Sequence, residues 1–461
     1  MQPNSQLDVL LDQSGISRAG LAMRINRRGA ENNVTLRYDH TAVARWLKGQ
    51  RPRGRVPELI CEVLGARLER TLTLADIGMG GPSGALSPAS VQGAGEVADG
   101  EYAEDGALLG RFVERAVVSW RSDQLHADTP GPALLTGAAA VAPVWEWENP
   151  PDDLDVSHQG TREVSELDVA VLHAARGHYE HLYRNAGGVA TRPRVVGFLT
   201  GEVAPLLRGG YSDSTGRQLC RAAGSLAAVS GICAYDADEQ GLAQRYFHQA
   251  LRLGKASGDR LFGGYVVALL VNQALFLDDD RRAIACAEAV LRTPGPHSTP
   301  ALATDLYAMQ AKAYARIGDR RGAYRCMRSA EGSSALIRPE EEPEETGYVQ
   351  PGLVQVRMAE TLLVLGELSA AQRYAEEAAG APAHVRGRVN RLATLTDVEL
   401  SSGSAERAAQ TAVQMVDHAQ GIESQRLRQR MRRVREHLLR HPGTPADRAA
   451  KQIEETLRVP L

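Results

Sequence analysis

Apolar side chains recur every three or four residues along most of the chain, and this spacing predicts helices. From about Arg194 to His441 the pattern indicates helices of roughly 12–20 residues, separated by short Gly, Asp and Pro breaks. Only 5% of the residues are aromatic. The predicted core is therefore built mainly from Ala, Leu and Val, which suit closely packed helices better than strands. We expect an all-α protein.

One short pattern returns five times in this region. Its clearest copy is Ala243-x3-Phe247-x2-Ala250, with Gly231 twelve residues before it. Small residues at such positions let two antiparallel helices pack closely, as in tetratricopeptide (TPR) repeats. The pattern predicts a TPR-like α-solenoid; a generic Ala-rich solenoid is the alternative. Looser copies, with spacings of 40, 40, 48 and 37 residues, are Ala283/Ala287/Val290, Ala323/Met327/Ala330, Ala371/Ala375/Ala378 and Ala408/Ala412/Met415.

The N-terminal region has its own, shorter helical pattern. Ser17 is a suitable N-cap for one predicted helix, and Gly49 can end another in a left-handed conformation. In that second helix Val43, Trp46 and Leu47 face inward, which leaves His40, Thr41, Ala42 and Arg45 on the other side. The predicted helices are Leu7–Gln13, Ser17–Arg28, Asp39–Lys48, Val56–Leu64 and Thr73–Ile77.

Changes in composition divide the chain further. Residues 80–105 are rich in Gly, Ser, Pro and Ala, which is typical of a flexible linker. We predict a helical N-terminal domain over 1–79, the linker over 80–105, a helical connecting segment over 106–195, the repeats over 196–441 and a C-terminal tail over 442–461.

Charge separates the N-terminal region from the rest. The whole chain has a net charge of −3, whereas residues 1–80 contain twelve Lys or Arg and eight Asp or Glu. Arginine 45 is the best candidate for reading a base, because its planar guanidinium can bridge O6 and N7 of guanine. We expect base contacts from His40, Thr41, Ala42 and Arg45, and phosphate contacts from Arg18, Lys48, Arg51, Arg53 and Arg55.

Two segments of this region resemble the helix-turn-helix of phage-repressor (Xre-type) regulators. Ser17-Arg-Ala-Gly-Leu-Ala22 is similar to the supporting helix, and Val43-Ala-Arg-Trp-Leu-Lys-Gly49 to the recognition helix. The connection Asn26–Arg37 is longer than in that family, and Arg18 stands where the family often has Gln. The resemblance implies that the second helix enters the major groove of double-stranded DNA. Because a single reader of this kind buries little surface, we expect a homodimer on a two-fold operator.

Further stretches resemble NsdA-like regulators of high-GC filamentous bacteria. They are Val144-Trp-Glu-Trp-Glu-Asn-Pro-Pro151, Thr191-Arg-Pro-Arg-Val-Val196 and Gln240–Ala250. The resemblance implies a transcription regulator, in particular a repressor, that acts on sporulation or antibiotic production.

A related architecture, found in quorum-sensing regulators whose repeats bind a short peptide, implies that the repeats hold a peptide in a concave groove. A small molecule or a protein is the alternative ligand. The candidate lining residues are Asn272, Gln273, Gln310, Lys312 and Tyr314. On the sequence alone, an equally good interpretation is that they are ordinary exposed polar residues.

The sequence contains no motif for catalysis. The five cysteines are widely spaced, the histidines at 173, 178 and 181 lack partners for a zinc site, and there is no phosphate loop or nucleophile elbow. We therefore expect no catalytic residues, no metal and no cofactor. Asp152, Asp153 and Asp155 suggest a solvated acidic loop, and the arginines between 426 and 435 suggest a solvated capping helix.

The leading hypothesis is a cytoplasmic, nucleoid-associated DNA-binding regulator whose repeats dimerise or sense a ligand. The alternative is an interaction scaffold or anti-activator that works through protein partners without DNA. The longest apolar stretch, Ala133–Val144, is too short to span a membrane and contains Gly137 and Pro143.

Overall fold

The structure is a computed structural model that separates into two compact units, Met1–Gly95 and Glu96–Leu461. It describes residues 4–14, 16–31, 36, 38–52, 56–68, 72–74, 76–79, 109–125, 131–149, 151–292, 298–441 and 443–459. Over these ranges the chain is all-α, as expected, and the β-type pairing is confined to two isolated bridges, His158 with Tyr211 and Glu163 with Gly210. No helix there is long and apolar enough to cross a membrane. The linker expected at 80–105 lies outside the described residues.

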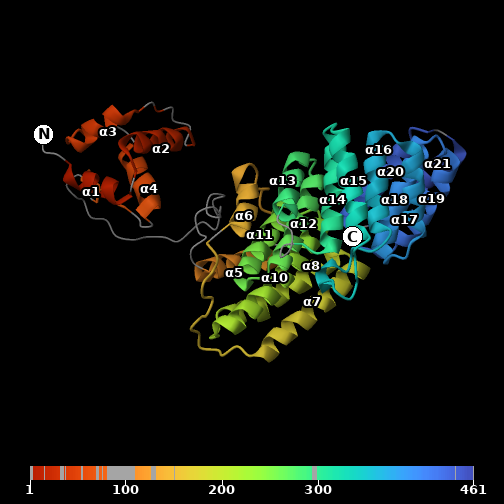
Figure 1. Cartoon of the computed structure of the whole chain (residues 1–461), viewed down its shortest axis with the longest axis horizontal. Helices are drawn as coiled ribbons and strands as arrows, with labels where there is room; N and C mark the ends of the chain where they lie inside the picture. Colours follow the sequence, from red (N-terminus) through yellow and green to blue (C-terminus); the bar gives the residue numbers. More distant parts are fainter. Residues whose placement is uncertain are drawn as a thin grey trace. The chain divides into compact units, whose positions relative to one another are not determined.

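Over its described residues, the first unit is a small bundle of four helices around one core (Figure 1). Leu21, Ile25 and Leu64 are among the side chains that are completely buried in it. Four of the five predicted helices are confirmed. At Thr73–Ile77 the described residues instead form turns, because the backbone N–H and the hydroxyl of Thr73 both donate to Asp76, each at 2.7 Å. The helices are α1 (Ser5–Ser14), α2 (Arg18–Glu31), α3 (His40–Leu47) and α4 (Val56–Leu68).

The second unit is a stack of helical hairpins preceded by a connecting segment (Figure 1). The connecting segment contains α5 (Leu109–Leu125), α6 (Ala138–Glu148), α7 (Glu166–Ala186), and a rod made of α8 (Gly188–Phe198), a π-helical turn (Leu199–Val203) and α9 (Ala204–Leu207). The first helices of the hairpins are α10 (Asp213–Asp236), α12 (Arg260–Phe276), α14 (Pro300–Arg316), α16 (Leu353–Leu365), α18 (Val385–Ser401) and α20 (Gln425–Leu438). Their second helices are α11 (Gln240–Ser257), α13 (Asp280–Leu291), α15 (Arg320–Ser334), α17 (Leu368–Gly380), α19 (Ala405–Ala419) and α21 (Thr444–Arg458).

The five copies of the sequence pattern form the second helices α11, α13, α15, α17 and α19. Every patterned side chain in them is buried, and all but Phe247 and Met327 are completely so. A Cβ atom on Gly231 of α10 would lie 2.6 Å from the Phe247 ring, so this close approach requires glycine. The prediction of repeated helical hairpins is confirmed, whereas the TPR class itself stays a prediction.

The turns within five hairpins share one conformation. One or two residues after the end of the first helix, φ is positive, at Asp238, Asp278, Gly318, Gly366 and Gly403. At the third turn the N–H of Gly318 donates to the carbonyl of Ala315 (3.1 Å), and that of Asp319 to the carbonyl of Tyr314 (2.9 Å). The same pair of hydrogen bonds recurs at the other four turns and satisfies carbonyls at the end of the helix.

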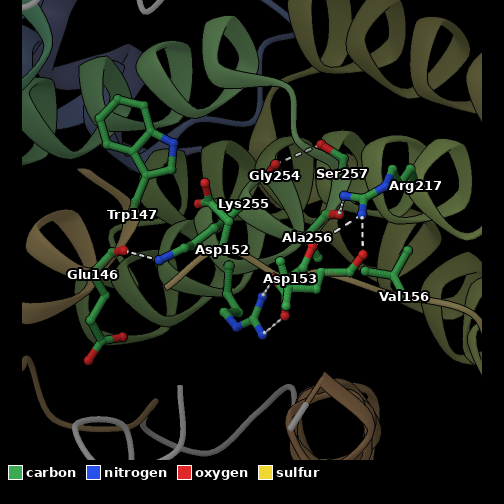
Figure 2. Close-up of polar contacts among 12 residues, drawn as sticks. Glu146, Trp147, Asp152, Asp153, Val156, Arg217, Gly254, Lys255, Ala256 and Ser257 are labelled. Atoms are coloured by element: carbon green, nitrogen blue, oxygen red, sulfur yellow. Dashed lines mark hydrogen bonds and ion pairs between the residues drawn. The ribbon is translucent and has the colours of Figure 1, made fainter. Parts of the chain in front are cut away.

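The end of α6 and the segment that follows it are fixed to α10 and α11 by basic side chains. Figure 2 shows Lys255 pointing at the carbonyl of Glu146, and Arg217 donating to the backbone of Asp153 and Ala256. The carboxylate of Asp153 also receives two 2.7 Å hydrogen bonds from Arg252. The acidic loop expected here is therefore partly tied to the helices by ion pairs rather than simply solvated.

A buried carboxylate joins the beginning and the end of the stack. Asp236, at the end of α10, is completely buried. It accepts hydrogen bonds from Arg386 of α18, from the Ser424 hydroxyl (2.7 Å) and from the backbone N–H of Gly188 (2.7 Å). The Arg386 guanidinium also lies 4.9 Å from the centre of the Tyr183 ring on α7. The last two hairpins therefore contact the first hairpin through this carboxylate.

Helix α20 is part of this closure. The Arg426 guanidinium lies 3.9 Å from the ring centre of Tyr235 and 4.1 Å from that of Phe276. Burial lowers the pKa of Arg426 to about 9. This helix is therefore packed within the unit, not a solvated cap, and the tail expected at 442–461 contains a further helix, α21, which packs against α19 and α20.

We predict that Gly318→Ala lowers the free energy of unfolding of the second unit by about 1 kcal/mol, because a Cβ disfavours positive φ. No heavy atom lies within 4 Å of a Cβ at this position, so a steric clash does not contribute. The control is Gly332→Ala in α15, where the space is equally open, and where alanine should be neutral or stabilising by up to about 1 kcal/mol. Chemical denaturation measures both, and equal effects of the two substitutions would contradict the argument.

Candidate nucleic-acid interface and inner face of the helical stack

The start of α3 is set by Asp39. Its carboxylate accepts hydrogen bonds from the backbone N–H of Ala42 (3.0 Å) and from the Thr41 hydroxyl (2.6 Å). The hydroxyl of Thr41, then the N–H of Ala42, lower the pKa of Asp39 and keep the cap ionised at neutral pH. The helix therefore begins at a defined residue, which fixes the directions of the side chains that follow.

Three polar side chains form an exposed stripe along the outer face of α3. Thr41, Arg45 and Lys48 are all exposed, and their spacing of four and three residues places them on one side of the helix. His40 is exposed at the first position of the helix. Four of the expected interface residues are thus accessible together.

Ala42 does not belong to this face. It is only 3% exposed and packs in the core with Val43 and Trp46. Positions 42 and 46 are four residues apart, so they share the inward side of the helix. The expected base contact from Ala42 was wrong.

The end of α3 confirms the glycine cap. Gly49 has φ of +95°, and its N–H donates to the carbonyl of Trp46 (3.0 Å), while the N–H of Gln50 donates to the carbonyl of Arg45 (3.0 Å). Just beyond this cap, the exposed Arg51 donates to the carbonyl of Met79. Arg51 therefore binds the last described residue of the first unit, and the expected phosphate contact from Arg51 stays a prediction.

Helix α2 supports α3 through one asparagine. The Asn26 amide donates to the carbonyl of Tyr38 (2.7 Å) and accepts from its N–H (2.8 Å). The Tyr38 ring in turn meets Trp46 edge-on, with 5.1 Å between ring centres. These contacts fix the end of the long connection expected at Asn26–Arg37, and its first six residues, 26–31, belong to α2.

Basic side chains on α2 add to the exposed charge. The Ser17 hydroxyl caps α2 by accepting from the N–H of Gly20 (3.1 Å), as predicted. Arg18, in its first turn, is exposed, and so is Arg24. Arg24 was not among the expected residues, and helical spacing gives no signal for it, because six residues place it about 120° around the helix from Arg18. Arg53 and Arg55 lie outside the described residues.

The polar residues expected to line a groove in the repeats are engaged within the stack. Gln273 and Gln310 are buried, and their amides donate to the carbonyls of Gln240 (2.8 Å) and Ile284 (3.3 Å). These two side chains therefore connect neighbouring helices instead of lining an open groove.

The other three candidates are half-buried and also paired. Asn272 donates to the Tyr235 hydroxyl (3.0 Å), and the Tyr314 hydroxyl to Glu288 (3.2 Å). Lys312 forms an ion pair with Glu360 (2.7 Å). Burial opposes ionisation of Glu360, but Lys312 and Arg430 outweigh it and lower its pKa to about 2.

Neither a metal centre nor a reactive thiol emerges from the described ranges. No group of three or more His, Cys, Asp or Glu side chains that could hold a metal ion occurs within them. All five cysteines are buried, and burial raises the pKa of Cys61, in the first unit, to about 11. At neutral pH this thiol is protonated and packs as a small apolar group.

One family comparison concerns the first unit. Residues 7–80 match a family model described as the SP15 N-terminal domain. The matched stretch coincides with the core of the first unit, whose buried residues run from Leu7 to Met79. No curated protein matches the chain.

We predict that Asn26→Ala lowers the free energy of opening of α3 by about 1–3 kcal/mol, because two partly buried backbone groups of Tyr38 lose their partner. Hydrogen exchange of the full chain measures this at residues 42–47. Gln13→Ala, at an exposed position of α1, is the control and should change exchange by less than about 0.5 kcal/mol. Unchanged protection of α3 in the Asn26 variant would show that this clamp does not hold the helix.

Proposed function

We propose that this protein is a sequence-specific DNA-binding transcription regulator whose first unit contacts double-stranded DNA through α3. The observation that carries the proposal is the exposed stripe of Thr41, Arg45 and Lys48 on a helix fixed at both ends. A short helix with polar and basic side chains on its free face fits the major groove, where an arginine can recognise guanine.

The surroundings of the stripe support the same interaction. Arg18 and Arg24 are exposed on α2, which packs against α3. The first 80 residues carry four more basic than acidic residues, whereas the chain as a whole is slightly acidic. Attraction to phosphates by such side chains positions a protein on DNA without specifying a sequence. We assign Lys48 and Arg18 to phosphates and Arg45, with Thr41 and His40, to base edges.

The second unit then supplies dimerisation or ligand sensing. A single small reader buries little surface on DNA, so a dimer on a two-fold operator is the expected source of useful affinity. Repression of development or of secondary metabolism follows from the resemblance to NsdA-like regulators and is part of the proposal on that ground alone.

The test is the salt dependence of binding to a labelled random-sequence duplex. The logarithm of the association constant should fall linearly with the logarithm of salt concentration, with a slope of about −0.9 per phosphate contacted. Lys48→Ala should make this slope less steep by about 1. Arg321→Ala, at an exposed position of α15 in the second unit, is the matched control and should leave the slope unchanged. Folded protein without salt-dependent binding would refute the proposal and favour the interaction scaffold.

A further inference from the structure

An acidic segment lies across the face of the stack that the first helices of the hairpins share, here called the inner face. Residues 335–352, here called the strap, connect α15 to α16. They account for the one long spacing, 48 residues, between copies of the repeat pattern. Five of the six residues from 340 to 345 are glutamates, and the sixth is Pro343. The strap is therefore a short acidic, proline-containing peptide built into the chain.

The strap contacts α7 and the first helices of three consecutive hairpins. Glu344 forms an ion pair with Arg176 of α7 (2.8 Å), and Glu345 with Arg221 of α10 (2.6 Å). Tyr348 packs near Tyr265 of α12, with 6.3 Å between ring centres. First helices of stacked hairpins share one face, so the strap occupies the face on which helical repeats offer a binding surface.

Two arginines form a preorganised site for carboxylates. The Arg221 guanidinium lies 4.1 Å from the centre of the Phe262 ring and is also paired with Asp259 (2.7 Å). The Arg176 side chain is only 4% exposed and is paired with Glu180 (2.5 Å). Arginine held in this way loses little freedom when it binds a carboxylate, which favours acidic ligands.

Three of the groups that bind the strap keep a second partner if the strap leaves. Arg176 keeps Glu180, and Arg221 keeps Asp259. The Tyr348 hydroxyl donates to Asp305 (2.8 Å), and Asp305 is itself paired with Arg357 of α16 (2.5 Å). Release of the strap therefore leaves each of these charges with a counter-ion. A buried charge without a counter-ion is what makes the removal of one ion-pair partner so costly.

We propose that the inner face of the stack is a docking site for an acidic peptide segment of another protein, and that the strap occupies this site as an exchangeable internal ligand. Arg176 and Arg221 bind the carboxylates, and the face of α12 and α14 receives an aromatic side chain in place of Tyr348. Docking of the partner segment and docking of the strap exclude each other. The proposal concerns the second unit alone and does not depend on DNA recognition by the first.

The test uses a fluorescent peptide with the sequence of residues 338–349 and the full chain. The double variant Glu344→Gln/Glu345→Gln should hold its strap more weakly than the wild type does. It should therefore bind the peptide at least about 100-fold more tightly than wild type, because in wild type the tethered strap competes at high effective concentration. Adding Arg221→Gln to this double variant should abolish the gain. A peptide in which both glutamates are replaced by Gln should not bind.

Hydrogen exchange of the wild-type chain keeps the proposal falsifiable if the double variant does not fold. Millimolar peptide should raise exchange within residues 338–349 and leave α12 and α15 unchanged. Unchanged exchange in the strap would mean that it is a permanent part of the fold, and the proposal would be wrong. A folded double variant that fails to bind the peptide would overturn it equally.

Discussion

The carboxylate of Asp236 is the contact on which the second unit most depends. It lies without solvent contact at the end of α10, and its hydrogen-bond partners come from α8, from α18 and from the segment before α20. A buried charge is tolerated only when it is paired and hydrogen-bonded, and removal of one partner costs about 3–5 kcal/mol. Asp236 therefore joins the first hairpin to the last one, because Ser424 lies 188 residues further along the chain, directly before α20.

This closure changes what a stack of hairpins can do. An open solenoid offers its first helices to any ligand, whereas here α7 packs against both α10 and α18, and the strap crosses α10, α12 and α14. Polar side chains on this face are paired with one another, as Lys312 is with Glu360. Recognition of a partner by this unit therefore requires exchange of existing ion pairs, which favours partners of matching charge.

The sequence predicted the hairpins well because their signal is local. Small residues at fixed helical spacing specify close packing, and every patterned side chain, such as Ala243 or Ala371, is buried. Contacts between residues far apart in the sequence leave no such local pattern. The pairing of Asp236 with Arg386, the strap on Arg221 and the packing of α20 within the unit join residues more than 100 positions apart.

In the candidate interface, too, local features were predicted from the sequence and long-range contacts were not. Helix periodicity placed Arg45 and Lys48 on the exposed face and Trp46 in the core. Ala42 lies at the border between the two faces of α3, a helix of eight residues. Its small side chain suits either an exposed or a buried position, so the sequence pattern did not place it, and it is buried by packing against the core. Arg51 was grouped with the phosphate contacts by charge alone, whereas its hydrogen bond to Met79 depends on the return of the chain 28 residues later.

Selection of bound duplexes from a random DNA pool tests the central claim most directly. The full-length wild type, Arg45→Ala and Lys48→Ala are compared side by side. The account predicts one enriched motif for the wild type and for Lys48→Ala, and loss of that motif for Arg45→Ala, because Arg45 is assigned to a base edge and Lys48 to a phosphate. Enrichment of the same motif by Arg45→Ala, or no enrichment by folded wild-type protein, would contradict it.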